Sequence, residues 1–271
     1  MALLPMIKQG DTGAIVRALQ ARIGADVDGV NGPDSVAKLK AFQRSRGLVD
    51  DGVAGPQTLA AAGVAFGGVD LSHWQTEVDA IKVGRDARFV YLKAAHGVGG
   101  VDKRWRARRA AFNDAGIPVG GYHFVVPNRD DPIEAAKHMA RTIGALGDHE
   151  LAPALDLEDY AKGMTPAQVC EWAGKYLDQL AETFGRAPVL YTGAAFLRYQ
   201  MAYGKSRPDL AKFPLWLARY RPGAVDPGDT GIWPSWLIWQ WTSGGRCQGV
   251  VGNVDCNVLL GTVADLQARR P

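Results

Sequence analysis

Acidic residues stand inside or at the ends of apolar segments that read as buried strands. Asp156 and Glu158 occur two positions apart in PALDLEDY. Asp70 lies in GVDLSHW and Asp255 in NVDCNVLL. Because side chains alternate along a strand, Asp156 and Glu158 would point to the same face, with Leu157 directed away from it. We therefore expect carboxylates from distant parts of the chain to meet at one site.

A cluster of carboxylates suits two kinds of chemistry. Oxygen ligands of this type can bind a divalent metal. They can also hydrolyse a glycosidic bond, a reaction that needs one protonated acid and at least one charged partner. Crowding of like charges raises the pKa of one carboxyl group, which can then keep its proton near neutral pH.

Aromatic residues in the same strand-like segments favour glycoside hydrolysis. Flat rings with polar edges suit the faces of sugar rings. Any single ring of this kind is more often core packing, but the set as a whole, beside the acids, indicates a carbohydrate cleft. We therefore predict no metal and no other cofactor. The candidate substrate-binding residues are Tyr122, Trp74, Tyr191, Trp216, Tyr220, Trp239 and Gln240.

The composition is that of a globular protein and argues against several other functions. The 271 residues are 47% hydrophobic and 22% charged, with a formal net charge of +3. Basic and acidic residues are mixed, unlike the basic face of a nucleic-acid binder, and no apolar run is long enough to span a membrane. HExxH and GxSxG are both absent, which argues against a zinc peptidase and a serine hydrolase. We expect a monomer without nucleic-acid or membrane partners.

The three cysteines are too few for a disulfide framework. Cys170 falls in a helical pattern and is predicted to be a small core residue. Cys247 and Cys256 could meet across a hairpin. Synthesis in the cytosol favours their reduced form, and whether they form a disulfide stays open at this point.

The N-terminal segment contains a short repeat. DGVNGPDSV at 28–36 and DGVAGPQTL at 51–59 share one pattern, in which Asp-Gly favours a turn and Gly-Pro starts a helix. Together with an amphipathic segment behind Asp11, the two copies predict a three-helix domain over residues 1–64. A second, larger domain would then cover residues 65–271.

In the second domain, strand-like segments alternate with helical ones. This order predicts parallel strands, and eight of them predict a closed barrel with its chemistry at the C-terminal strand ends. The expected fold class is α/β: a (β/α) barrel with eight strands and missing helices near the C-terminus, plus a small all-α three-helix N-terminal domain. The strand-like segments are 68–74, 88–96, 118–125, 152–158, 187–193, 214–220, 237–243 and 253–260.

Both parts resemble known families. Residues 7 to about 63 resemble the three-helix peptidoglycan-binding domain in motifs that include Gln9-Gly10-Asp11, both Asp-Gly pairs and both Gly-Pro pairs. The larger part carries GVDLSHWQ, GGYHF, ALDLED, VLYTG, LWLARY, LIWQWTS and NVDCN. Their order resembles that in glycoside hydrolase family 25, whose members are lysozymes of the N-acetylmuramidase type.

The resemblance implies cleavage of the β-1,4 bond between N-acetylmuramic acid and N-acetylglucosamine in peptidoglycan. It implies that Glu158 is the general acid and that Asp156 either orients the 2-acetamido group or activates water. Asp70 and Asp255 match the other two family acids, and Tyr122 matches a substrate-side hydroxyl. Retention and inversion at the reacting carbon both stay open.

Other interpretations carry different expectations. A non-catalytic wall-binding protein would grip glycan without lysing walls, and a bacterial autolysin would have the same activity as a phage endolysin. The N-terminus lacks the features of a secretory signal. We therefore expect an endolysin made in the host cytoplasm without a signal peptide, which acts on the bacterial cell wall after release. A family 18 chitinase would need acids at two positions that Leu151 and Ala154 occupy in this chain. The motif therefore argues against that family.

Overall fold

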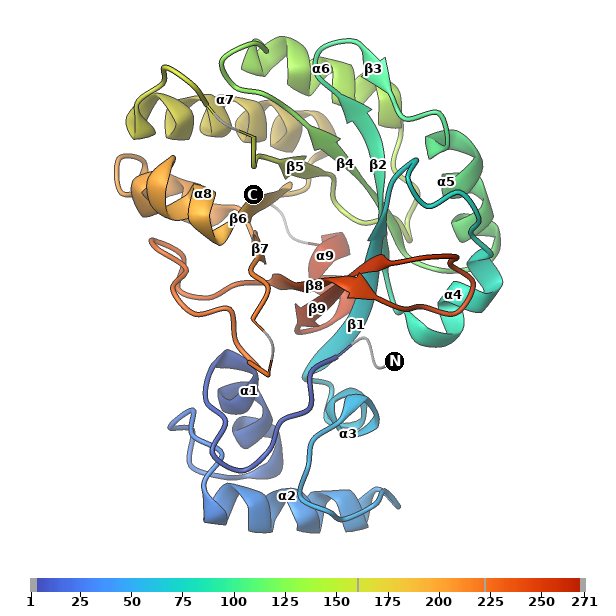
Figure 1. Cartoon of the computed structure of the whole chain (residues 1–271), viewed down its shortest axis with the longest axis vertical. Helices are drawn as coiled ribbons and strands as arrows, with labels where there is room; N and C mark the ends of the chain where they lie inside the picture. Colours follow the sequence, from blue (N-terminus) through green and yellow to red (C-terminus); the bar gives the residue numbers. More distant parts are fainter. Residues whose placement is uncertain (1–3, 160, 222, 269–271) are drawn as a thin grey trace.

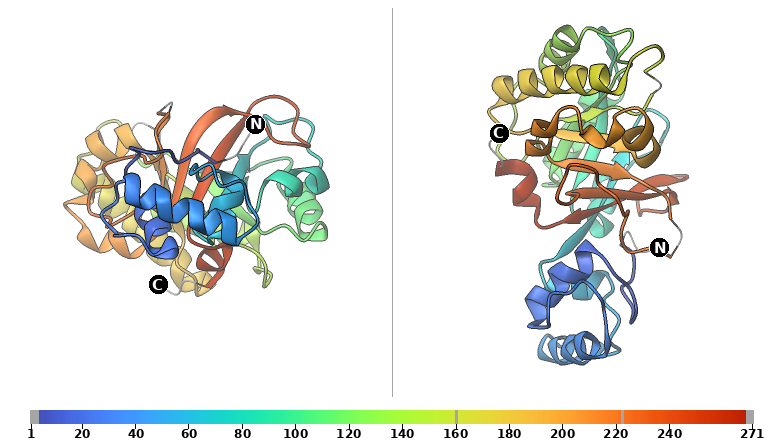
Figure 2. Two further views of the ribbon diagram at one scale, coloured as in Figure 1. Left: turned by 90° about the horizontal axis from the view of Figure 1, so that it is seen from below. Right: turned by 90° about the vertical axis from the view of Figure 1, so that its left-hand side faces the viewer.

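The computed structural model describes residues 4–159, 161–221 and 223–268. Three helices lie at one end of the molecule, and a barrel with peripheral helices forms the rest (Figure 1). Two further views show the same arrangement from below and from the side (Figure 2). The outermost residues of the two predicted domains, 1–3 and 269–271, lie outside the described ranges.

The N-terminal helical unit, residues 4–64, contains the helices that the repeat predicts. They are α1 Ala14–Ile23, α2 Pro33–Ser45 and α3 Pro56–Ala61. Pro33 and Pro56 both occupy the first turn of their helices, as the Gly-Pro pairs indicate. A proline is tolerated there because its missing N–H has no partner within the helix.

A buried glutamine holds each copy of the repeat together. The Gln20 carboxamide accepts a hydrogen bond from the Gly29 N–H at 2.8 Å, and Gln43 accepts one from Gly52 at 3.0 Å. The Nε2 of each glutamine, with two hydrogens to donate, also lies within hydrogen-bond distance of three oxygens of its own loop and following helix. These are Asp28, Val30 and Ser35 for Gln20, and Asp51, Val53 and Thr58 for Gln43. The repeat is thus one hydrogen-bonded turn built twice.

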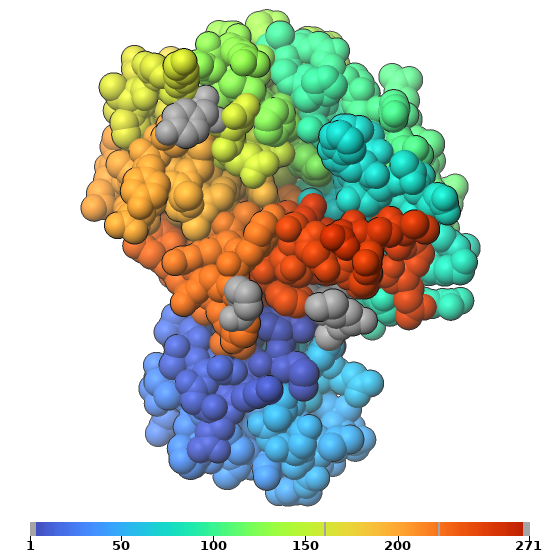
Figure 3. Space-filling model, viewed as in Figure 1, coloured from blue at the N-terminus to red at the C-terminus, as the bar shows by residue number. Residues whose placement is uncertain are grey.

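Helix α1 is capped by a residue from the barrel. Its N-cap, Gly13, has no side chain and adopts φ 132°, where a side chain would be strained. The Asp226 Oδ2 instead accepts a hydrogen bond from the Ala14 N–H at 2.8 Å, and Oδ1 accepts one from Gly228 at 2.7 Å. A Cβ on Gly13 would lie 2.6 Å from Asp226, so glycine also makes room for this contact. Figure 3 shows the close contact between the helical unit and the barrel.

Replacing Asp226 by alanine should lower the free energy of unfolding by about 1 kcal/mol, the typical value of a helix cap. The α1 N-terminus would then keep a partly buried N–H without its acceptor. Thermal and urea unfolding measure the change. Asp226→Asn keeps a single acceptor oxygen, which can serve the Ala14 or the Gly228 N–H but not both, and should lose less stability than Asp226→Ala. Equal stability of Asp226→Ala and the parent would show that this contact contributes nothing.

Within the described residues, eight strands close the barrel, in the order β1-β9-β8-β7-β6-β5-β4-β2, with β1 paired to β2. The short strand β3 extends the sheet outside the barrel as a hairpin with β2. The eight-stranded barrel predicted from the sequence is confirmed. The strands are β1 Ala65–Leu71, β2 Val90–His96, β3 Gly100–Val101, β4 Val119–Phe124, β5 Ala154–Asp156, β6 Val189–Gly193, β7 Leu215–Ala218, β8 Ile238–Gly245 and β9 Val254–Leu260.

The last strand runs against the predicted direction. Strand β9 pairs antiparallel with both β8 and β1, whereas the other barrel pairs are parallel. The reason is the short connection from β8, which is a hairpin, because a parallel return would need a crossover of a dozen or more residues. The N-terminal end of β9 therefore lies at the same rim as the C-terminal ends of the other strands.

Helices flank the first part of the barrel, and their caps follow the sequence. The Asp131 side chain accepts hydrogen bonds from the N–H groups of Ile133 and Glu134, and Thr165 forms a capping box with Gln168. No helix follows β7 or β8 before the next strand within the described residues, as predicted. The helices are α4 Ala80–Asp86, α5 Trp105–Asp114, α6 Pro132–Ile143, α7 Pro166–Phe184, α8 Ala194–Tyr199 and α9 Val263–Ala268, with 3-10 turns at Ala202–Gly204 and Pro208–Lys212. No described helix combines the length and apolarity required to cross a bilayer.

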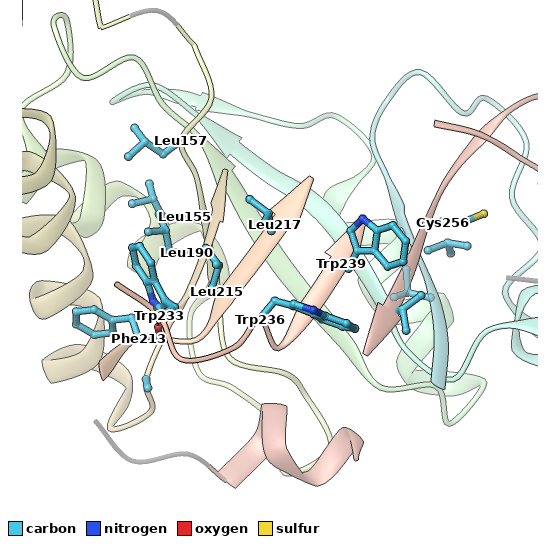
Figure 4. Packing of buried hydrophobic residues seen from close by; sticks show 14 of the residues in the cluster. Leu155, Leu157, Leu190, Phe213, Leu215, Leu217, Trp233, Trp236, Trp239 and Cys256 are labelled. Carbon is cyan, nitrogen blue, oxygen red and sulfur yellow. Dashed lines mark hydrogen bonds between the residues drawn. The ribbon is translucent and has the colours of Figure 1, made fainter. Parts of the chain in front are cut away.

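Two apolar layers follow from the alternation of side chains along the strands. One layer lies outside the barrel, between strands and helices, and contains Leu155, Leu217 and Trp239 (Figure 4). The other fills the barrel and contains Ala154, Trp216 and other residues. Neighbouring strand residues belong to different layers because successive side chains point to opposite faces.

Candidate active site

All four candidate acids line one pocket of about 170 Å³. Five of the seven candidate substrate-binding residues line it as well. The complete lining is Asp70, Tyr122, Asp156, Glu158, Tyr191, Trp216, Tyr220, Gln240 and Asp255. The meeting of carboxylates from separate stretches of chain, predicted from residue type and spacing, is therefore present.

Three strands position the acids. Asp156 is the last residue of β5, and Glu158 follows two residues later, on the same side of the chain. Asp70 in β1 is the register partner of Asp255 in β9. Since β9 is antiparallel, Asp255 reaches the rim from the start of its strand, whereas Asp70 and Asp156 reach it from strand ends. Asp70 and Asp156 are each only 6% exposed, while Glu158 is exposed at the mouth.

Two amides hold the buried Asp70 carboxylate. Its Oδ2 accepts hydrogen bonds from Gln240 Nε2 and from Asn257 Nδ2, both at 2.8 Å. Asn257 in turn accepts a hydrogen bond from Trp216 Nε1 at 2.8 Å. Asn257 was not predicted as a site residue, although it lies two residues after Asp255 and so shares its face of β9. Gln240, predicted to bind substrate, here orients an acid.

A hydrogen-bonded network links Glu158 to this amide. The Tyr191 hydroxyl lies 3.2 Å from Glu158 Oε2 and 3.1 Å from Gln240 Oε1. The Tyr220 hydroxyl donates to the same Gln240 oxygen at 2.7 Å. A tyrosine hydroxyl has a single proton to donate. When Tyr191 donates this proton to Gln240, the Tyr191 oxygen can only accept a hydrogen bond from Glu158. Glu158 must then carry a proton.

The environment raises the pKa of every acid in the pocket. Burial is the main cause for all four, and it favours the neutral form. The charge of Asp255 raises the pKa of Asp70 further, whereas the two amide donors lower it. The charge of Glu158 raises the pKa of Asp156 further. Burial and the charge of Glu158 together raise the pKa of Asp255 to about 6. The site can therefore hold protons near neutral pH.

Lys93 is the cation that opposes this effect. Its charge lowers the pKa values of Asp156 and Glu158. Its ammonium group lies 4.6 Å from the centre of the Phe124 ring, which steadies it by a cation–π contact. Lys93 lies on β2 and pairs in register with Tyr122. Lys93 was not predicted as a site residue, because a lysine within an apolar strand has no motif of its own.

Two of the predicted aromatic residues do not reach this pocket. Trp239 is fully buried, and its Nε1 donates to the Arg219 carbonyl at 2.9 Å, in the layer outside the barrel. Its neighbour Gln240 faces the acids, so alternation along β8 directs Trp239 away. Trp74 is 78% exposed and lies against the His73 ring at 4.7 Å between ring centroids. The placement of Trp239 beside the acids was therefore wrong, whereas substrate binding by Trp74 stays a prediction.

The cysteines are not joined to each other. Cys170, Cys247 and Cys256 are free and buried, so the possible Cys247–Cys256 disulfide is absent. Burial raises the thiol pKa of Cys256 to about 12, which keeps it protonated and unreactive beside Asp255. Within the described residues, no group of three or more His, Cys, Asp or Glu side chains is arranged to hold a metal ion.

Asn257 supports both Asp70 and Trp216, and its replacement should affect stability and pH dependence together. Asn257→Leu leaves the buried Trp216 N–H unsatisfied, at an expected cost of about 1–3 kcal/mol in unfolding free energy. It also removes a donor that lowers the Asp70 pKa. The acidic limb of the pH–rate profile should therefore move to higher pH.

Urea unfolding and activity measured across pH test this expectation. Asn253→Leu, in the exposed turn before β9, is the control and should change neither property. An unchanged acidic limb in Asn257→Leu would exclude Asp70 as a group that must be ionised for activity.

Comparison with known proteins yields two family matches. Residues 69–250 match the model of glycosyl hydrolases family 25, and residues 11–62 match that of a putative peptidoglycan binding domain. Among curated proteins, the chain is 31% identical over 209 residues to lysozyme M1 of Streptomyces globisporus, covering 74% of this chain and 70% of that protein.

Solved structures agree with the sequence matches. The bacterial lysozyme of Streptomyces coelicolor superposes with a TM-score of 0.69 at 29% identity, over 75% of this chain and 95% of that one. The spore cortex lytic enzyme SleM of Clostridium perfringens superposes with a TM-score of 0.67 at 28% identity, over 74% of this chain and 69% of that one.

Proposed function

Because this chain belongs to glycosyl hydrolases family 25, we propose that it hydrolyses the β-1,4 bond between N-acetylmuramic acid and N-acetylglucosamine in bacterial peptidoglycan. It is a glycoside hydrolase of the lysozyme type. The observation that carries the proposal is the pocket in which Asp70, Asp156, Glu158 and Asp255 meet beside tyrosine and tryptophan rings. Such a pocket offers both a proton donor and negative charge to a sugar.

Glu158 is proposed as the general acid. It is the acid at the mouth of the pocket, where the glycosidic oxygen of a long polymer can approach it. Partial burial of the Glu158 carboxyl group raises its pKa. A fraction of the molecules therefore carries the proton that the leaving oxygen needs. The Tyr191 hydroxyl at 3.2 Å keeps the carboxyl group in one orientation.

Asp156 is proposed to hold the 2-acetamido group of the sugar that is cleaved. Its Oδ1 is buried and has no hydrogen-bond partner among the described residues. A buried carboxylate oxygen without a donor is costly, and the N–H of an acetamido group is a suitable donor. In that position the acetamido carbonyl could attack the anomeric carbon, and this supports the substrate-assisted route over direct activation of water.

Asp70 and Asp255 are proposed to stabilise the positive charge that develops on the sugar ring. Burial and the charge of Asp255 raise the pKa of Asp70, and the two amide donors offset part of this rise in favour of the charged form. Asp255 faces Asp70 across the β1–β9 pair. Negative charge that is already oriented before the reaction lowers the barrier without reorganisation.

The N-terminal helical unit is proposed to bind the wall. A groove of about 460 Å³ lies along its second repeat and is lined by the exposed Met6 and Val49, among other residues. The Asp226 contact with α1 attaches this unit directly to the barrel. Wall binding would therefore keep the acid pocket near its polymeric substrate and raise the local concentration.

Mass spectrometry of digested cell walls tests the proposed bond specificity. New reducing ends on N-acetylmuramic acid are expected. Reducing ends on N-acetylglucosamine, or free peptides, would contradict the proposal. Glycan binding without any new reducing end would instead support a non-catalytic wall-binding protein.

We further propose that the protein is made in the cytoplasm of a bacterial host, acts on the wall after release and works as a monomer. Fractionation of producing cells before and after lysis tests the route, and light scattering tests the oligomeric state. A bacterial autolysin of the same activity would appear outside intact cells.

A further inference from the structure

A second pocket, of about 500 Å³, adjoins the acids. It shares Glu158, Tyr191 and Tyr220 with the acid pocket, so the two hollows form one continuous surface. Its remaining lining comes from two stretches of chain. One stretch runs from the end of β6 through α8, and the other follows β7. The lining residues that carry the inference are Arg198, Tyr199, Tyr203, Arg219 and Asp229.

The first wall contains a strained turn. Ala202 and Tyr203 have φ values of 46° and 61°, in the left-handed region that residues other than glycine rarely adopt. The turn is held from the other wall, because the Ile232 N–H donates to the Tyr203 carbonyl at 3.1 Å. Gly231 permits this approach, since a Cβ there would lie 2.6 Å from the same oxygen. Strain maintained by surrounding contacts is typical of ligand-binding segments.

The second wall is anchored at both ends. The Arg219 backbone joins β8 through Gln240, and its guanidinium donates to the Pro227 carbonyl at 2.8 Å. Asp226, which caps α1, lies on this same connection. The contact with the helical unit therefore helps to hold the pocket wall in place, and the pocket is a preformed feature of the folded chain.

The pocket presents rings and positive charge. Tyr199 and Tyr220 are 65% and 52% exposed, which leaves much of their surface open to a sugar. Arg198 stands above the Tyr199 ring, with its guanidinium carbon 5.1 Å from the ring centre. Neither Arg198 nor Arg219 takes part in an ion pair within the described part of the chain. The Asp229 carboxylate already accepts a hydrogen bond from the Gly231 N–H at 2.9 Å.

We propose that this pocket binds the leaving half of the glycan and that Arg198 pairs with a carboxylate of the peptide attached to it. The inference rests on the proposed function, because the proton donor Glu158 marks the side on which the leaving sugar lies. Peptidoglycan carries acidic peptides on its muramic acid units, so a strand that passes Glu158 brings carboxylates to this wall. Arg198 then determines a preference for peptide-bearing over neutral glycan.

Walls with and without negative charge on their peptides test the proposal. Phosphate polymers are first removed with hydrofluoric acid, and half of the preparation is then amidated with carbodiimide and ammonia. The measured quantity is kcat/KM for release of reducing ends, and the parent protein should prefer the unamidated walls. Arg198→Gln should reduce that preference about two- to fivefold, as expected for loss of one exposed ion pair.

Two further variants separate recognition of charge from recognition of sugar. Tyr199→Ala should lower kcat/KM on both walls by a similar factor, because it removes a ring face and no charge. Arg106→Gln removes an exposed arginine on α5 that lines neither pocket, and it should behave as the parent protein. An equal loss on both walls in Arg198→Gln, or no loss on either, would overturn the assignment of Arg198.

The proposed function can fail separately from this inference. If the parent protein releases no reducing ends from either wall, the muramidase proposal itself is wrong. Binding of the Glu158→Gln and Glu158→Gln/Arg198→Gln variants to the two walls reports whether amidation acts through Arg198 or through the N-terminal helical unit. A drop in binding on amidation that is equally large in both variants would contradict a role for Arg198.

Discussion

Replacing Glu158 by glutamine should reduce kcat on purified cell walls by about 10²- to 10⁴-fold, the usual contribution of a well-placed general acid. Glutamine has nearly the same shape, and its amide can still hydrogen-bond to the Tyr191 hydroxyl, which lies 3.2 Å from Glu158 in the parent protein. It cannot supply a proton to the leaving oxygen. The loss should therefore appear in kcat, with KM close to that of the parent protein.

The measurement is the loss of turbidity of purified walls, together with reducing-end release and a thermal melt. Glu182→Gln, on the exposed side of α7, makes the same chemical change away from the pocket and is expected to lyse walls normally. A Glu158→Gln protein that remains fully lytic would refute the assignment of the general acid. A variant that melts at a much lower temperature would show that Glu158 has a structural role instead.

Replacing Asp255 by asparagine should stabilise the protein at neutral pH while lowering its activity. The pKa of Asp255 rises from the ordinary value of 3.8 to about 6 in the folded state, through burial and the charge of Glu158. A folded-state pKa above the unfolded one means that ionisation opposes folding. The stability that neutral Asp255 contributes is thus fully present below pH 3.8 and is lost as pH rises through about 6.

Asparagine has the same shape as the neutral carboxyl group and avoids this loss. The expected gain at pH 7 is about 1–3 kcal/mol in the free energy of unfolding, which corresponds to a rise of about 2–10 °C in Tm for a chain of this size. Urea unfolding at several pH values measures it. The gain should shrink towards zero below pH 4, where Asp255 is protonated in both states.

Asp114→Asn, at the exposed end of α5, provides the control and should leave the stability unchanged at every pH. A loss of stability in Asp255→Asn at pH 7 would mean that the charged form of Asp255 is stabilised by contacts that outweigh its burial. The opposite changes in stability and activity that we expect are typical of acids kept for catalysis.

The sequence alone placed most of the acid site. Asp156 and Glu158 stand two apart, and alternation along a strand puts them on one face whatever the rest of the fold. The same rule, applied to β9, would also have selected Asn257 beside Asp255. It would have excluded Trp239 once Gln240 was chosen, because neighbours on one strand cannot face the same side. The omission of Asn257 and the inclusion of Trp239 both arose because residue type was given more weight than the alternation of side chains along a strand.

The repeat of the N-terminal unit was equally visible, because turns depend on local residue types. Asp-Gly and Gly-Pro pairs predicted both loops and both helix starts, and Pro33 and Pro56 stand in the first turns of α2 and α3. The central role of Gln20 and Gln43 was not visible. A buried glutamine is recognised only when its partners, spread over 15 residues of sequence, are seen around it.

Other features depend on contacts that no local pattern encodes. The pairing of β9 with β1 depended on closure of the barrel, and it sets Asp255 opposite Asp70. The cap of α1 comes from Asp226, 212 positions from Ala14, and Lys93 acts on Asp156 and Glu158 from a different strand. Local sequence thus determined which residue types share a face and where turns begin. Only the tertiary structure decided which faces meet, because that depends on chain closure and on packing between residues far apart in sequence.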